Sequence, residues 1–303
     1  MAQGPDSARP LRWADLRARI LSALVLAPVA ILIVWLGGSA WSVLVTVIGA
    51  GVACEWVALC GGVVRAPPGI IVPTAVTLAG ALAAGTASVI ALAVLLAGCA
   101  AVVVAAAWRE AGRTRRPASL HPDDRAIRTF GQSARRHRAL AGGVVYVGLA
   151  IVALIWLRQD SAAGRANTLF LLVTVWASDV GAYAFGRLLG GPKLAPRISP
   201  AKTWAGSAGG VATAVAVGCA LALSLGPRGA FWAIAAVAAG LSVAAQIGDL
   251  LESAVKRRFG VKDSGRIIPG HGGLLDRLDG LLTAAPAAAV LALALGRGLV
   301  LWQ

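Results

Sequence analysis

Long apolar runs, separated by short polar segments, make up most of this chain. Several runs reach the roughly 18–20 residues that are needed to cross the hydrocarbon core of a bilayer. The pattern predicts nine membrane spans, or eight if the short third run does not cross, at residues 20–36, 39–60, 70–85, 87–108, 139–157, 168–185, 207–226, 230–249 and 281–301. We therefore expect an all-α, polytopic integral membrane protein.

The composition agrees with this pattern. Hydrophobic residues make up 58% of the 303 residues and charged residues only 14%, well below the roughly 25% that is typical of soluble domains. The first run follows a basic segment, as a signal peptide would. The many later runs favour a first helix that is retained in the membrane.

The basic residues are distributed unevenly between the two sides of the membrane. With a cytoplasmic N-terminus, 24 of the 28 Lys and Arg residues fall in the cytoplasmic segments 1–19, 61–69, 109–138, 186–206 and 250–280. Because cytoplasmic loops carry an excess of Lys and Arg, we expect this orientation in the cell (inner) membrane. The net charge of +15 then lies beside anionic lipid headgroups, and no nucleic-acid partner is needed to explain it.

Residues 109–138 form the most polar and basic segment between two predicted spans. This segment is expected to be a solvated cytoplasmic linker beside lipid headgroups, helix-poor at its proline residues. It divides the chain into residues 1–138, with the N-terminal spans and the linker, and residues 139–303, which are expected to form the catalytic region.

Only 13 carboxylates are present, so their positions are informative. Glu55 is the one acid within a predicted span of the N-terminal half. An intramembrane acid is a functional candidate by default, although a structural role beside a basic partner explains Glu55 equally well. Asp179 lies in the sixth predicted span, near its cytoplasmic end.

The segment QIGDLLESAVKRR ends the eighth predicted span. Its Asp249, Glu252, Ser253 and Lys256 have the spacing i, i+3, i+4 and i+7, so they share one face of a helix. Such a face could hold a cation and meet a phosphate at its edge. The alternative is an ordinary helix end with an i,i+4 ion pair between Glu252 and Lys256.

The segment KDSGRIIPGHGGLLDRLDG, residues 262–280, favours a phosphate-binding interpretation. Its proline and glycines oppose regular helix and allow several N–H groups to point at an anion. Helical spacing resumes in LLDRLDG, where Asp276 and Asp279 are three residues apart. Carboxylates near Lys262, Arg266 and Arg277 suit an anion that is held partly through Mg²⁺.

A third polar segment, residues 186–206, is predicted on the same side. It contains four basic residues, including Lys202 in ISPAKTWAG. Taken alone, it is explained as a positive cytoplasmic loop. Together, three basic loops and several acids at one membrane face favour phosphate chemistry.

At this point the residues resemble a known family. Residues 253–279 resemble the signature of the phosphatidate cytidylyltransferase (CDP-diacylglycerol synthase) family, as do the segments ASDVGAYAFGRLLG, ISPAKTWAG and QIGDLLES. The resemblance covers about residues 165–282. The matching signature positions are Ser253, Lys256, Arg257, Lys262, Asp263, Pro269, Gly270, His271, Gly272, Gly273, Asp276, Arg277 and Asp279. One departure is Ala205, which stands where the family commonly has an acid.

The resemblance implies an enzyme that joins CTP and phosphatidate into CDP-diacylglycerol and pyrophosphate with Mg²⁺. It implies that Asp249 and Asp276 hold the metal, with Asp179 as a possible third ligand or an orienting group for a lysine. It also implies a second, monovalent cation such as K⁺, and a homodimer among membrane lipids.

The expected site divides its work among three groups of residues. Asp249, Asp276 and Lys256 are expected to be catalytic. Basic groups would hold the phosphates, and Ser253 and the glycine backbone would donate hydrogen bonds; the substrate-binding set is Lys202, Ser253, Arg257, Lys262, Gly270, His271, Gly272, Gly273 and Arg277. For His271, a proton shuttle and a structural role in the turn both stay open.

Two other classes of function are alternatives. One is another CTP-dependent lipid enzyme, such as a polyprenol kinase or a CDP-archaeol-type synthase. The other is a transporter, but a transporter is expected to carry its polar groups near the bilayer centre. Here the polar groups gather at one membrane face.

Overall fold

The computed structural model of the chain describes residues 28–114, 124–160, 162–226, 229–265, 273–296 and 298–303. This part is almost entirely helical, as expected. Seven of its helices are long and apolar enough to cross a membrane. They are α2 (Gly38–Leu59), α4 (Ser88–Thr114), α5 (Asp124–Gln159), α6 (Gly164–Leu189), α7 (Trp204–Ser224), α8 (Phe231–Arg258) and α9 (Leu275–Leu295).

Two of the nine expected spans are not among these seven. The first, 20–36, lies partly outside the described residues, and residues 28–36 are helical. The third corresponds to α3 (Ile71–Ala84), an apolar helix of 14 residues. At 1.5 Å per residue, α3 is about 21 Å long, shorter than the roughly 30 Å of a hydrocarbon core.

The expected position of the last span was wrong. Helix α9 runs from Leu275 to Leu295 and not from 281 to 301. It begins early because Asp276 accepts backbone hydrogen bonds at its start, and it ends at Gly296, whose φ is +103°. The tail after Gly296 places Trp302, only 1% exposed, against Phe170 at a ring separation of 4.5 Å.

The expected linker over 109–138 is partly helical. Helix α4 continues to Thr114 and α5 begins at Asp124. The prolines of the segment, Pro117 and Pro122, where it was expected to be helix-poor, lie outside the described residues.

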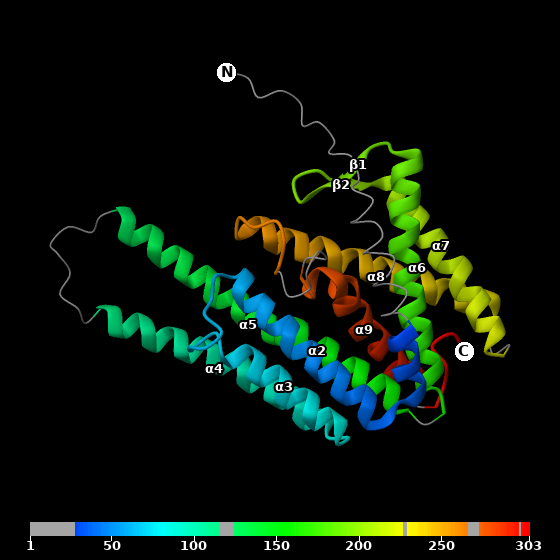
Figure 1. The fold of residues 1–303 in the computed structure, drawn as a ribbon, viewed down its shortest axis with the longest axis horizontal. Coiled ribbons are helices and arrows are strands. Elements are labelled where there is room, and N and C mark those ends of the chain that lie inside the picture. The colour runs from blue at the N-terminus through cyan, green and yellow to red at the C-terminus, as the bar shows by residue number, and fades with distance from the viewer. Residues whose placement is uncertain (1–27, 115–123, 161, 227–228, 266–272, 297) are drawn as a thin grey trace.

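Figure 1 shows helices α2 to α5 gathered on one side of the molecule and α6 and α7 on the other, with α8 and α9 between them. Helix α5 packs against α2, α3 and α4 and also against α9. Helix α9 in turn packs against α8 and α6. The late helices α8 and α9 thus join the two halves of the chain.

The end of the molecule opposite the polar loops uses two of the four arginines outside the predicted cytoplasmic segments. The Arg158 Nε donates to the Val34 carbonyl at 2.7 Å. The Arg165 guanidinium lies 4.5 Å from the centre of the Trp35 ring, at the range of a cation–π interaction. Both arginines contact the end of the helix at 28–36. This contact explains why they lie outside the predicted cytoplasmic segments.

Small residues allow α6 and α7 to approach closely. A Cβ atom at Gly181 would lie 2.4 Å from Thr213 Oγ1, and one at Gly209 would lie 2.3 Å from Phe185 Cβ. Such close approach through glycine is typical of helix pairs in membranes. It sets the position of the Asp179 end of α6 relative to the start of α7.

Residues 190–203 contain a small β-hairpin where the sequence suggested only a loop. Strands β1 (Lys193–Ala195) and β2 (Ser199–Thr203) are antiparallel, with Lys193 opposite Thr203. The Thr203 hydroxyl then accepts a hydrogen bond of 3.1 Å from the Gly206 N–H and so caps α7. The hairpin is therefore fixed to the helix that follows it.

Candidate active site

A polar cavity of about 550 Å³ lies where the end of α6, the hairpin, and the ends of α7, α8 and α9 meet. Helices α8 and α9 pack together, and the last turns of α8 lie beside the first turn of α9. Charged side chains of both signs line the cavity; they are Asp179, Arg187, Lys202, Asp249, Lys256, Asp276, Arg277 and Asp279. The sequence prediction that acids and bases gather at one end of the bundle is confirmed for these residues.

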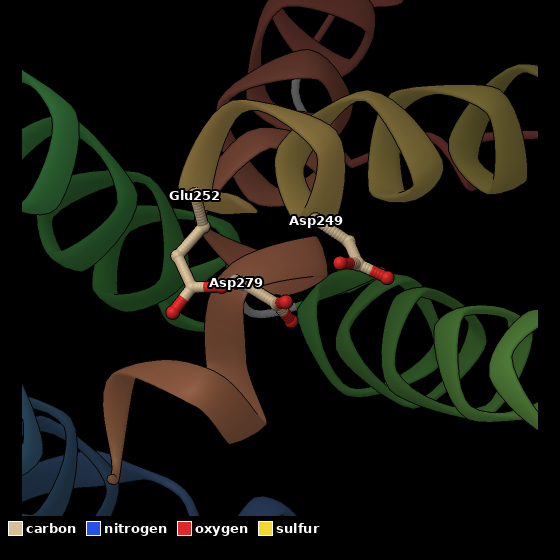
Figure 2. Close-up of side chains that lie close together, drawn as sticks. All are labelled: Asp249, Glu252 and Asp279. Atoms are coloured by element: carbon tan, nitrogen blue, oxygen red, sulfur yellow. The ribbon is translucent and has the colours of Figure 1, made fainter. Parts of the chain in front are cut away.

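Three carboxylates beside this cavity form a cluster that could hold a cation. Figure 2 shows Asp249 and Glu252 projecting from α8 toward Asp279 on α9. Each residue offers one carboxylate oxygen, and these oxygens all lie within 4.8 Å of one another. Opposite ligands of an octahedral Mg²⁺ with bonds of about 2.1 Å are roughly 4.2 Å apart, so the cluster is near the required size.

The burial of Glu252 is a second observation that fits a metal. Its side chain is 1% exposed, and among the described residues no donor gives a hydrogen bond to its Oε1. A buried carboxylate needs a cation or hydrogen-bond donors to offset its lost hydration. A divalent ion held by the three carboxylates would supply that partner to Glu252 Oε1.

Lys256 connects α8 to α9. Its Nζ lies 2.7 Å from Glu252 Oε2 and 2.9 Å from Asp276 Oδ1. The Glu252–Lys256 pair, which the sequence offered as a mere helix-end contact, therefore belongs to the polar site. A lysine held by two carboxylates is fixed at the cavity wall, where it could meet an anionic substrate.

Asp276 acts as a cap for the first turn of α9. Its Oδ2 accepts a hydrogen bond of 2.9 Å from the Gly273 N–H and one of 3.2 Å from the Ser264 N–H. Together with Lys256 Nζ, these two N–H groups use much of the hydrogen-bonding capacity of the Asp276 carboxylate. The sequence-based role of Asp276 as a metal ligand stays a prediction, while Asp279, one turn further along α9, reaches the carboxylates of α8.

The hairpin contributes a second lysine. Lys202 on β2 forms an ion pair with Asp249 on α8. Nearby, the Arg257 Nε donates to the Ile198 carbonyl at 3.3 Å. Arg257, which was expected to bind substrate, thus connects the end of α8 to the hairpin and is not among the cavity-lining residues.

The remaining predicted residues differ in position. Ser253 is half-buried on α8 and Lys262 is exposed beyond its end. The Gly273 N–H is directed at Asp276. The other three predicted substrate-binding positions, Gly270, His271 and Gly272, lie outside the described residues.

A hydrogen-bond network around Gln246 supports the cavity. No pattern in the sequence had indicated it. The Gln246 Nε2 donates to the Ser207 carbonyl at 3.2 Å, and its Oε1 accepts from the Ser207 hydroxyl. The hydroxyls of Ser178 and Ser242 are 2.7 Å apart, and Gln246 Nε2 also reaches Ser242 Oγ at 3.3 Å. These contacts join α6, α7 and α8 directly behind the acids.

Glu252 and Asp279 lie in the two sequence patterns that suggested cation binding, but neither was chosen as a metal ligand. The available signal was helical spacing, because Glu252 follows Asp249 by three residues and Asp279 follows Asp276 by three. Residues at this spacing share a helix face. The sequence-based choice of Asp276 stays a prediction, and the carboxylate cluster adds Glu252 and Asp279 as candidates.

Taken together, the fold and the cavity define a polytopic helical membrane protein with a cluster of carboxylates and basic groups at one end of its bundle. The sequence profile of the cytidylyltransferase family matches residues 17–295, and the chain belongs to this family. It is 38% identical over 272 residues to a phosphatidate cytidylyltransferase of Brucella suis, covering 89% of this chain and 91% of that protein. It is 42% identical over 148 residues to a phosphatidate cytidylyltransferase of Staphylococcus saprophyticus, covering 49% of this chain and 56% of that protein.

Proposed function

We propose that this chain is a phosphatidate cytidylyltransferase, which converts CTP and phosphatidate into CDP-diacylglycerol and pyrophosphate. One observation carries the proposal: the cluster of Asp249, Glu252 and Asp279 lies beside a cavity lined by lysines and arginines. Membership of the cytidylyltransferase family supports it. A site with both signs of charge suits the joining of two phosphorylated anions.

The reaction forms one bond and breaks one. An oxygen of the phosphatidate phosphate attacks the α-phosphorus of CTP, and the bond from that phosphorus to the bridging oxygen of pyrophosphate breaks. The nucleophile is already an anion, so no strong general base is required. The main demand on the protein is to reduce the repulsion between the reactants and to align them.

The basic residues of the cavity wall meet this demand. Lys202, Lys256 and Arg277 would hold phosphate oxygens, as the sequence predicted. Lys256 is oriented by Glu252 and Asp276 before substrate arrives, because both carboxylates lie within 2.9 Å of its Nζ. A preoriented charge loses less free energy to reorganisation during the reaction.

Asp249, Glu252 and Asp279 would hold the divalent metal, which we propose is Mg²⁺. When bound, Mg²⁺ would neutralise phosphate charge and orient the reacting groups. Asp276 and Asp179 stand as further proposed ligands from the sequence. A second, monovalent cation such as K⁺ is also proposed, on the resemblance to the family alone.

We further propose that the cavity faces the cytoplasm of the cell (inner) membrane, where CTP is present. The distribution of Lys and Arg supports this orientation, because the cavity is formed by the ends of helices next to the basic segments 186–206 and 250–280. The N-terminus would then be cytoplasmic, with span 20–36 and α3 bringing the count to nine.

A homodimer in contact with membrane lipids is proposed on the family resemblance. In the same way, residues 139–303 are proposed as the catalytic region.

The position of the label in CTP tests the reaction type. Purified protein in detergent is incubated with phosphatidate, Mg²⁺ and CTP labelled either at the α- or at the γ-phosphate. If the proposal is correct, the α-label appears in CDP-diacylglycerol and the γ-label in pyrophosphate. Transfer of the γ-label to a lipid would identify a kinase, and no labelled product from folded protein would reject both.

A further inference from the structure

Glu55 is a buried acid from the N-terminal half of the chain that the proposed reaction does not yet use. It lies on α2 and is 3% exposed, deep among apolar helices. Its position is more than 190 residues from the acids of α8 and α9 in the sequence. An intramembrane carboxylate is costly and needs a specific explanation.

The carboxylate of Glu55 contacts the first turn of α9. Its Oε2 accepts a hydrogen bond of 2.7 Å from the Leu275 N–H and lies 3.5 Å from the Ser264 hydroxyl. The first N–H groups of a helix have no partner inside the helix, and negative charge at this end is favourable. Glu55 therefore caps α9 from a different helix.

Two glycines show how closely the backbone surrounds this carboxylate. A Cβ atom at Gly265 would lie 2.5 Å from Glu55 Oε1, and one at Gly273 would lie 2.8 Å from Glu55 Oε2. Both positions thus require the absence of a side chain. Gly265 and Gly273 therefore both pack directly against the Glu55 carboxylate of α2.

Glu55 and Asp276 hold the same two backbone segments from opposite halves of the chain. Asp276 accepts from the N–H groups of Ser264 and Gly273, while Glu55 contacts the Ser264 side chain and the Leu275 N–H. The segments before and after residues 266–272 are therefore fixed to α2 as well as to α9. A shift at Glu55 would move Asp276 and Asp279 on α9 relative to Lys256 and the acids of α8.

We infer that Glu55 is a positioning residue: it fixes the first turn of α9 so that Asp276 and Asp279 face Lys256 and the acids of α8. Its effect on the rate rests on the proposed function, but its effect on α9 does not. The site proposed within residues 139–303 therefore also depends on the N-terminal helices, because α2 supplies this contact. Groups that orient metal ligands typically change activity by about 10–100-fold when they are removed.

Hydrogen exchange and kinetics of four variants test this inference. Glu55→Ala removes the acceptor, and Glu55→Asp keeps the charge but shortens its reach by one methylene group. Glu55→Gln can keep the bond to the Leu275 N–H and places its amide nitrogen where Oε1 lies, and Oε1 accepts from no described donor. Ser42→Ala is the matched control, because Ser42 is equally buried on α2 and donates only within α2 in the described contacts.

The inference predicts a local effect with a kinetic consequence. In Glu55→Ala and Glu55→Asp, amide exchange in the peptide covering residues 273–279 should rise at least about tenfold, with other helices unchanged. The kcat should fall by roughly 10–100-fold, with the KM for CTP nearly unchanged. Glu55→Gln should restore most of both properties, and Ser42→Ala should change neither.

Other outcomes overturn the inference. Wild-type exchange at residues 273–279 in Glu55→Asp would show that Glu55 does not hold α9. Faster exchange in all helices of Glu55→Ala and Glu55→Asp alike would show a general stabilising role only. If the wild type forms no CDP-lipid, the proposed function fails, while the exchange data still decide whether Glu55 fixes α9.

Discussion

Lys256 on α8 donates a hydrogen bond of 2.9 Å to the Oδ1 of Asp276 on α9. The two residues are 20 positions apart, and the segment between them leaves α8 and returns to start α9. This pair brings the acids of the two helices together at the cavity. It also gives a first test of how the site is stabilised.

Replacing Lys256 by methionine should reduce both stability and activity. The change leaves Glu252, which is 1% exposed, and Asp276 without their shared cation, and the loss of one partner from a buried ion pair costs about 3–5 kcal/mol. Because Lys256 is partly exposed, we expect about half of that value. Thermal unfolding measured in detergent checks it, with Lys193→Met on the exposed hairpin as control. Equal unfolding temperatures of the two variants would contradict the bridging role.

Asp279→Asn and Asp276→Asn should have different kinetic effects. If Asp279 is a metal ligand, its amide variant should need at least about tenfold more Mg²⁺ for half-maximal rate. If Asp276 mainly orients Lys256 and caps α9, its variant should lower kcat with a smaller change in the Mg²⁺ requirement. The measurement is a Mg²⁺ titration of the initial rate. The reverse order of the two Mg²⁺ requirements would restore the sequence-based choice of Asp276 as the ligand.

Gln246→Leu should destabilise the packing of α6, α7 and α8. The substitution leaves the half-buried Ser207 hydroxyl and carbonyl without Gln246, and an unsatisfied buried polar group costs about 1–3 kcal/mol. Denaturant or thermal unfolding measures the loss. Gln303→Leu, the same chemical change at an exposed position, should be neutral. A stability loss of the same size in both variants would show that the network around Gln246 contributes nothing.

Cysteine labelling tests the orientation in the membrane. Arg197→Cys lies on the exposed hairpin and Ser224→Cys at the far end of α7. In intact spheroplasts, a membrane-impermeant maleimide should label Ser224→Cys but not Arg197→Cys, and in inverted vesicles the order should be reversed. The opposite result would place the cavity outside the cytoplasm.

The native cysteines should give little background in this experiment. Cys60 is only 1% exposed, so a reagent in solution should reach its thiol slowly. Cys219 is buried, and Cys54 and Cys99 are half-buried within helices. The unsubstituted protein measures the remaining background directly.

The sequence predicted the apolar helices well because hydropathy reports burial in lipid over about 20 residues. It was less accurate where a helix continues into polar sequence. Helix α9 begins at Leu275 because Glu55 and Asp276 accept the N–H groups at its start, and no hydropathy window contains that information. Helix α4 likewise continues to Thr114, and α5 begins at Asp124, in polar sequence that was not predicted to span the membrane.

The sequence brought the charged residues of α6, α8 and α9 to one end of the bundle, where they line one cavity, but it could not choose among the acids as ligands. Spacing alone puts Asp276 and Asp279 on the same face of α9, so the choice between them depends on the rotation of α9 against α8. The contact of Glu55 with Leu275 spans 220 residues and leaves no local pattern. Such long-range contacts are set by packing and become visible only in the folded chain.

Direct binding of a metal to the acidic cluster tests the central claim most closely. Mn²⁺ replaces Mg²⁺ as a spectroscopic probe, and its binding to the full-length protein in detergent with CTP is measured by electron paramagnetic resonance. If the cluster holds the metal, the wild type binds Mn²⁺ saturably, Asp249→Asn and Asp279→Asn bind it at least about tenfold more weakly, and Lys193→Met binds it like the wild type. Equal Mn²⁺ affinity in all four proteins would contradict the assignment of the metal to the cluster between α8 and α9.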